Sequence, residues 1–136
     1  MAADPFVGTR NMNIAKCKAT NPSALVKSET WKTVAIDNGI KTIFDGVTLE
    51  GQAYHVEASY IFDGKDYPVK GYPMADMTSA KKIDVNTILV VNKKGGKEVE
   101  RWRFTVSKDG KTQTAAGNGI TPNGVAYSGT FVFDKQ

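Results

Sequence analysis

Residues 52–62 read QAYHVEASYIF, and their side chains alternate in character. From residue 54 the even-numbered positions are apolar or aromatic: Tyr54, Val56, Ala58, Tyr60 and Phe62. The positions between them are polar at His55, Glu57 and Ser59 and apolar at Ile61. Because successive side chains of a strand point to opposite faces, this period of two predicts a β-strand with one face in a core. Asp63-Gly64 follows and predicts a hairpin turn, since glycine tolerates the positive φ that such turns require.

The same pattern recurs along the chain. Apolar positions alternate with polar ones in residues 101–106, and a similar alternation recurs in residues 127–133. Further turn signals separate such segments: Asp37-Asn38-Gly39, Asp45-Gly46, Glu50-Gly51, Lys94-Gly95-Gly96, Asp109-Gly110 and Pro122-Asn123-Gly124. Strands at intervals of about 8–12 residues with turns between them are typical of an all-β sandwich or barrel.

We predict strands at residues 9–16, 28–36, 40–44, 52–62, 67–69, 78–83, 87–92, 98–107, 112–117 and 126–133. Residues 21–25 are expected to form one helical turn or a loop, and Gly117-Asn118-Gly119 a bulge or bend. Consecutive hairpins predict an all-β fold: an antiparallel up-and-down meander of about 8–10 strands. Closure into a barrel would remove the exposed edges of such a sheet. With 136 residues, the chain is expected to be a single domain over residues 1–136.

Several segments resemble bacterial lipocalin-like domain proteins. They are residues 6–13 (FVGTRNMN), 62–69 (FDGKDYPV), 92–97 (NKKGGK) and 106–112 (VSKDGKT). The resemblance implies a calycin-like, lipocalin-like barrel that binds a small ligand, and it carries over no catalytic residue, because most of that group has no assigned function. Arg10 stands where such openings usually have a Trp that packs across the closed end of the barrel. Either this barrel floor is built differently, or Arg10 points outward.

The formal net charge of +4 is spread along the chain. The paired lysines, Lys81-Lys82 and Lys93-Lys94, lie near predicted turns, where lysine blocks pairing between sheet edges. We expect no nucleic-acid partner, because such a site needs a clustered basic patch with stacking aromatic side chains. No apolar run approaches the ~20 residues of a membrane-spanning helix, so no membrane span is expected.

The chain has one His and one Cys. These are too few for a zinc site, which usually takes several such ligands, and a single thiol makes no internal disulfide. Gly95-Gly96 lacks the flanking glycines of a phosphate-binding loop. We therefore expect no metal and no cofactor. The start, Met1-Ala2-Ala3-Asp4, is similar to the remnant of cleavage at a small-residue site with a methionine added, which predicts a periplasmic or secreted protein, with a cytoplasmic one as the alternative.

Aromatic side chains supply the candidate ligand-binding residues. Those expected to face a ligand are Trp31, Tyr54, Tyr60 and Tyr127. A barrel of about eight strands either is filled by side chains or holds one small ligand, and the sequence leaves both possibilities open. Arg101 and Arg103 share one strand face and would clamp an anion if that face pointed inward. Trp102 on the opposite face indicates that they point outward.

Three functions remain open from the sequence. The first is binding of a small, hydrophobic or amphipathic ligand without transforming it. The second is a small barrel enzyme in which His55 and Glu57, on one strand face, act as acid and base. The third is a structural or interaction module, either a monomer or a homodimer. The sequence favours a binding protein over an enzyme, because a His and a Glu two residues apart on a strand are commonly just a solvated face.

Overall fold

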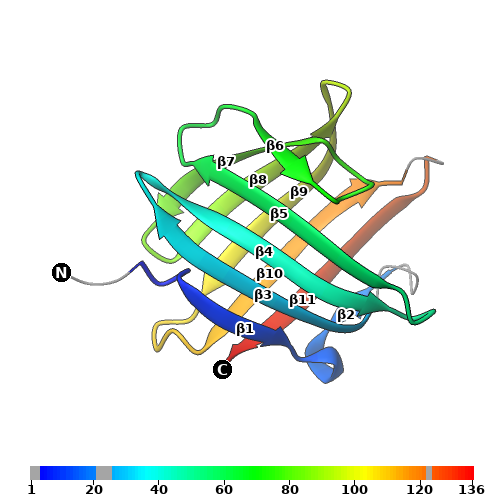
Figure 1. The fold of residues 1–136 in the computed structure, drawn as a ribbon, viewed down its shortest axis with the longest axis horizontal. Coiled ribbons are helices and arrows are strands. Elements are labelled where there is room, and N and C mark those ends of the chain that lie inside the picture. The colour runs from blue at the N-terminus through cyan, green and yellow to red at the C-terminus, as the bar shows by residue number, and fades with distance from the viewer. Residues whose placement is uncertain (1–3, 21–25, 122–123) are drawn as a thin grey trace.

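The computed structural model of the protein describes residues 4–20, 26–121 and 124–136. Strands make up most of this part of the chain (Figure 1). One 3-10 turn, η1 (Ile14–Lys16), lies between the first two strands. The strands are β1 (Gly8–Met12), β2 (Lys18–Ala19), β3 (Val26–Ile36), β4 (Gly39–Thr48), β5 (Ala53–Ile61), β6 (Tyr67–Lys70), β7 (Met77–Asp84), β8 (Thr87–Lys94), β9 (Lys97–Val106), β10 (Thr112–Ile120) and β11 (Ala126–Lys135). Among the described residues, none forms a helix long and apolar enough to cross a membrane.

The sheet closes on itself through β1. Each strand from β3 to β11 pairs antiparallel with the next, and β1 pairs with both β3 and β11. Arg10 of β1 is thus opposite Trp31 on one side and Lys135 on the other. The result is a closed ten-stranded up-and-down barrel, with β2 as an extra strand on β11. The predicted all-β, closed antiparallel meander is confirmed.

Two glycine positions differ from the sequence-based prediction. β4 runs straight through Asp45-Gly46, where a turn is predicted, and β10 pairs in continuous register through 117–119, where a bulge or bend is predicted. Both predictions are wrong because these glycines make room for a side chain on a neighbouring strand, β5 beside Gly46 and β9 beside Gly117. A Cβ on Gly46 would meet the hydroxyl of Tyr54, and one on Gly117 would lie 2.7 Å from the ring of Trp102.

The first predicted strand is too long at its C-terminal end. β1 ends at Met12, and Ile14–Lys16 form the 3-10 turn η1 instead of continuing the strand. The short strand β2 that follows has no counterpart among the predicted strands. The expected turn or loop at residues 21–25, the segment Met1–Ala3, and residues 122–123 of a predicted turn lie outside the described residues.

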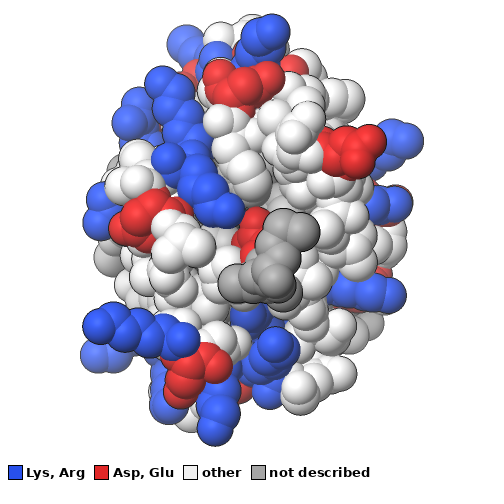
Figure 2. All heavy atoms as spheres, turned by 90° about the vertical axis from the view of Figure 1, so that its left-hand side faces the viewer, with Lys and Arg blue, Asp and Glu red and all other residues white. Residues whose placement is uncertain are grey.

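One end of the barrel is closed by the N-terminal segment, on the left in Figure 1. Phe6 and Arg10 are each 1% exposed. The Arg10 guanidinium donates to the carbonyl oxygens of Pro5 (2.8 Å), Phe6 (3.1 Å) and Gly110 (3.1 Å) and to Oε1 of Gln113 (3.2 Å). Arg10 therefore points inward, and this floor is built from an arginine hydrogen-bond network. Outside, Figure 2 shows basic side chains spread over this end with acidic ones among them.

Candidate binding cavity

The barrel contains a cavity of about 510 Å³ that is partly open to solvent. Pockets that hold small molecules typically measure about 300–1,000 Å³, so the space is large enough for one such ligand. Its walls come from inward-facing residues of strands all around the barrel, such as Thr42 of β4, Val90 of β8 and Ala115 of β10. At the end opposite Arg10, Thr48, Pro73 and Thr121 also line it. The interior is therefore hollow, which decides between the two possibilities that the sequence leaves open.

Aromatic rings form much of the cavity wall. Trp31 is central: its ring centroid lies 4.7 Å from that of Phe44, 4.8 Å from Phe104 and 4.9 Å from Phe133. Trp102 packs against another aromatic side chain of the wall, Phe131, at 5.7 Å. Tilted and edge-to-face ring pairs of this kind stabilise a core beyond their buried area. The rings give the cavity a rigid apolar lining.

One buried carboxylate, Glu100, organises a polar cluster in this lining. Glu100 is 2% exposed and accepts hydrogen bonds from the hydroxyl of Tyr72 (2.7 and 2.8 Å), from Nδ2 of Asn92 (2.9 Å) and from the hydroxyl of Tyr127. Burial and the neighbouring Glu100 charge raise the pKa of Tyr72 well above its usual value. Burial and the hydrogen bond to Glu100 raise the pKa of Tyr127. Both phenols therefore stay protonated and act as donors. Several donors to one buried carboxylate offset its loss of hydration.

A second carboxylate, Glu29, lies on β3 two residues before Trp31. It accepts a hydrogen bond from the hydroxyl of Tyr54 on β5. Protein surrounds Glu29 on nearly all sides, although it keeps some accessible surface because it faces the cavity. Burial raises the pKa of Glu29 to about 7, and the Tyr54 hydrogen bond only partly opposes that rise. Glu29 thus changes charge near neutral pH.

The structure brings four of the predicted ligand-binding residues together and separates the other two from them. Trp31, Tyr54, Tyr60 and Tyr127 all line the cavity. Arg101 and Arg103 are exposed on the outer face of β9. Arg101 pairs there with Glu98, with N–O distances of 2.8 and 2.9 Å. The two arginines are therefore not part of the cavity wall.

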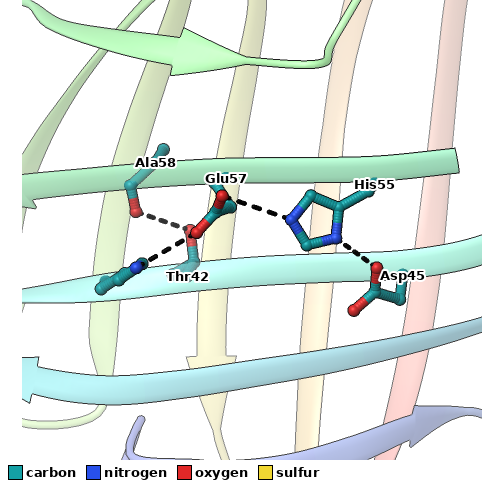
Figure 3. Close-up of polar contacts among 6 residues, drawn as sticks. Thr42, Asp45, His55, Glu57 and Ala58 are labelled. Atoms are coloured by element: carbon teal, nitrogen blue, oxygen red, sulfur yellow. Dashed lines mark hydrogen bonds and ion pairs between the residues drawn. The ribbon is translucent and has the colours of Figure 1, made fainter.

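His55 and Glu57 lie on the outside of the barrel wall (Figure 3). The His55 side chain is 54% exposed, with Nδ1 hydrogen-bonded to Asp45 and Nε2 3.3 Å from Glu57. These two acidic side chains raise the pKa of His55, with the Asp45 hydrogen bond as the larger cause. Glu57 also pairs with Lys41 at 3.1 Å. The cluster is a row of solvent-accessible charged side chains across β4 and β5, and neither His55 nor Glu57 lines the cavity.

The sequence analysis misses the residues of the two carboxylate clusters in the cavity, among them Glu29, Tyr72, Asn92 and Glu100. Strand periodicity is a signal that finds two of them. Glu100 lies two residues before Trp102, and Glu29 two before Trp31, so each shares the inward face of an aromatic residue. Tyr72 follows β6 in an irregular segment, where no periodicity predicts its direction.

Comparison with protein-family models and with curated proteins finds no match to this chain. The closed antiparallel barrel is consistent with a calycin-like fold. The resemblance to bacterial lipocalin-like proteins therefore rests on the sequence segments described above. What the cavity does has to be argued from its own residues.

Proposed function

We propose that the protein binds one small, partly apolar molecule inside its barrel and does not transform it. The observation that carries this proposal is the cavity of about 510 Å³, with its aromatic wall and its few converging polar groups. A mostly apolar pocket with a small number of placed polar groups is the usual form of a small-molecule site. Binding would bury apolar ligand surface, at about 0.8 kcal/mol for each CH₂ group removed from water.

The position of the polar groups supports the same function. The Tyr72 and Tyr127 hydroxyls and the Asn92 amide are engaged with Glu100, which holds them in place. Rigid polar groups orient a ligand at low entropic cost, because they are already ordered before it binds. The enzyme alternative finds no comparable support, since His55 and Glu57 are solvated on the outer wall.

A fluorescence titration tests the proposal. The chain has two tryptophans, Trp31 and Trp102, and both line the cavity. The neutral probe N-phenyl-1-naphthylamine accepts energy from tryptophan and brightens in apolar surroundings. We expect saturable binding of one probe per chain, with loss of tryptophan emission. An absence of saturable binding would refute the proposal.

Two substitutions at adjacent positions of β5 test whether the probe binds inside the cavity. Ala58→Phe adds a ring inside the cavity, because Ala58 faces inward. Ser59→Phe adds the same ring on the exposed face of the same strand. We expect Ala58→Phe to weaken probe binding at least tenfold, about 1.4 kcal/mol, and Ser59→Phe to leave it unchanged. Far-UV circular dichroism of both variants checks that they fold. Equal probe affinity in the two variants would show that the probe binds outside the cavity.

A further inference from the structure

The charges that line the cavity are all of one sign. Glu29 and Glu100 line it, and within residues 4–20, 26–121 and 124–136 no Lys, Arg or His side chain does. The remaining ten residues, 1–3, 21–25 and 122–123, contain no Lys, Arg or His in the sequence either. The lining of the binding space is therefore acidic, and the inward-pointing Arg10 guanidinium lies outside this lining, in the barrel floor. The protein as a whole has a formal net charge of +4.

The two carboxylates differ in how far protein donors satisfy them. Tyr72, Asn92 and Tyr127 all donate to Glu100. Within the described part of the chain, Tyr54 is the one residue that donates to Glu29. A carboxylate offers about four acceptor positions, so Glu29 retains capacity for further donors. Of the two carboxylates, Glu29 is thus the one that a ligand can use as an acceptor.

We propose that the preferred ligands are organic cations, with an ammonium group held by Glu29 and an apolar body against the aromatic wall. This inference rests on the proposed binding function and names its ligand class. A buried ionised carboxylate with few donors is costly, and a ligand cation would offset that cost. The aromatic faces of Trp31, Trp102 and the tyrosines attract cations as well. A fatty acid would instead place its own negative charge beside Glu29 and Glu100.

The ionisation of Glu29 makes cation binding depend on pH. The ionisable groups near enough to interact with Glu29 are Tyr54 of β5, Tyr72 after β6 and Cys17 before β2. Tyr72 also donates to Glu100. The pKa values of Tyr54, Tyr72 and Cys17 are all raised, so these three side chains remain neutral near pH 7. Affinity for an alkylammonium ligand that stays protonated over this range should therefore rise as Glu29 ionises, through about pH 7, and then level off.

Competition among three ligands of equal chain length tests the inference. Decylammonium, which stays protonated at about pH 8.5 and has N–H donors for Glu29, is compared with decanol and decanoate. Each is tested for displacement of N-phenyl-1-naphthylamine at that pH, below its micelle or solubility limit. The expected order of affinity is cation, then alcohol, then carboxylate, with the cation about tenfold or more ahead of the alcohol, as expected for a hydrogen-bonded charge pair. Equal affinities, or a preference for decanoate, would overturn the inference and leave the proposed function standing. Failure of the neutral probe itself to bind would overturn both.

Two matched substitutions assign the preference to Glu29. Glu29→Gln removes the charge from the cavity, and Glu50→Gln removes the same charge from the exposed turn between β4 and β5. We expect Glu29→Gln to abolish the advantage of the cation and its pH dependence while decanol affinity stays the same. Glu50→Gln should retain both. An unchanged cation preference in Glu29→Gln would contradict the assignment even though the cavity binds ligands.

Discussion

Glu29 couples the charge of the empty cavity to the stability of the barrel. The folded protein keeps a proton on Glu29 up to about pH 7, whereas an unfolded chain releases it near the ordinary glutamate pKa of about 4.3. Between these values the folded state binds more protons than the unfolded state, so stability falls as pH rises. At 1.36 kcal/mol per pKa unit, Glu29 should cost the barrel about 3 kcal/mol between pH 4.5 and 8.5.

The Glu29→Gln variant measures this cost. Its amide has the shape of the protonated acid and does not titrate, so the variant should lack this loss of stability. Urea unfolding, followed by circular dichroism, gives the free energy of unfolding of both proteins at each pH. Relative to wild type, Glu29→Gln should gain about 3 kcal/mol as pH rises from 4.5 to 8.5, since other titrating groups contribute equally to both proteins.

Glu50→Gln is the control for the loss of one acidic side chain. Its difference from wild type should stay within about 0.5 kcal/mol at every pH, because Glu50 is exposed. The reasoning is refuted if the difference between Glu29→Gln and wild type does not change with pH. It is refuted as well if wild type gains stability relative to the variant as pH rises.

Three further predictions concern the floor, the outer wall and a strand glycine. Arg10→Met should destabilise the barrel by about 3–5 kcal/mol in urea unfolding, because buried carbonyls lose their charged donor; a cost below about 1 kcal/mol would contradict this. The pKa of His55, measured by NMR, should lie above the ordinary histidine value of about 6.5, and Asp45→Asn should lower it. A His55 pKa that is the same in Asp45→Asn and wild type would contradict the contribution of Asp45. Gly117→Ala should cost about 1–3 kcal/mol through contact with the neighbouring strand, whereas exposed Asn118→Ala should cost under about 0.5 kcal/mol.

The strands of the barrel can be predicted from local patterns in the sequence. Alternation from Tyr54 to Tyr60 and the glycines of the hairpin turns depend on neighbouring residues only, so they predict strands and their inward faces. Asp45-Gly46 shows the limit of this reasoning. Its sequence is that of a turn, yet Gly46 is required because the Tyr54 ring crosses it from the next strand. A contact between strands decides this position, and no local pattern reports it.

The site was less predictable than the fold. Aromatic residues such as Trp31 and Tyr127 could be assigned to the interior because their strands alternate. Glu29 and Glu100 have the same periodicity, but a charged residue at an inward position interrupts the alternation of apolar and polar residues, so the sequence alone does not place it inside. What makes Glu100 tolerable inside is a set of donors from other elements, among them Tyr72. That donor comes from an irregular segment, whose course depends on packing and not on period.

The central claim is that a small ligand lies inside the barrel. Isotope-filtered NMR on the complex with N-phenyl-1-naphthylamine locates the ligand directly. We predict contacts between the ring protons of the probe and the methyl groups of Val56 and Val90, which line the cavity from β5 and β8. Contacts confined to exposed apolar residues such as Ile83 and Val85 would contradict the claim, because they would place the ligand on the outside of the protein.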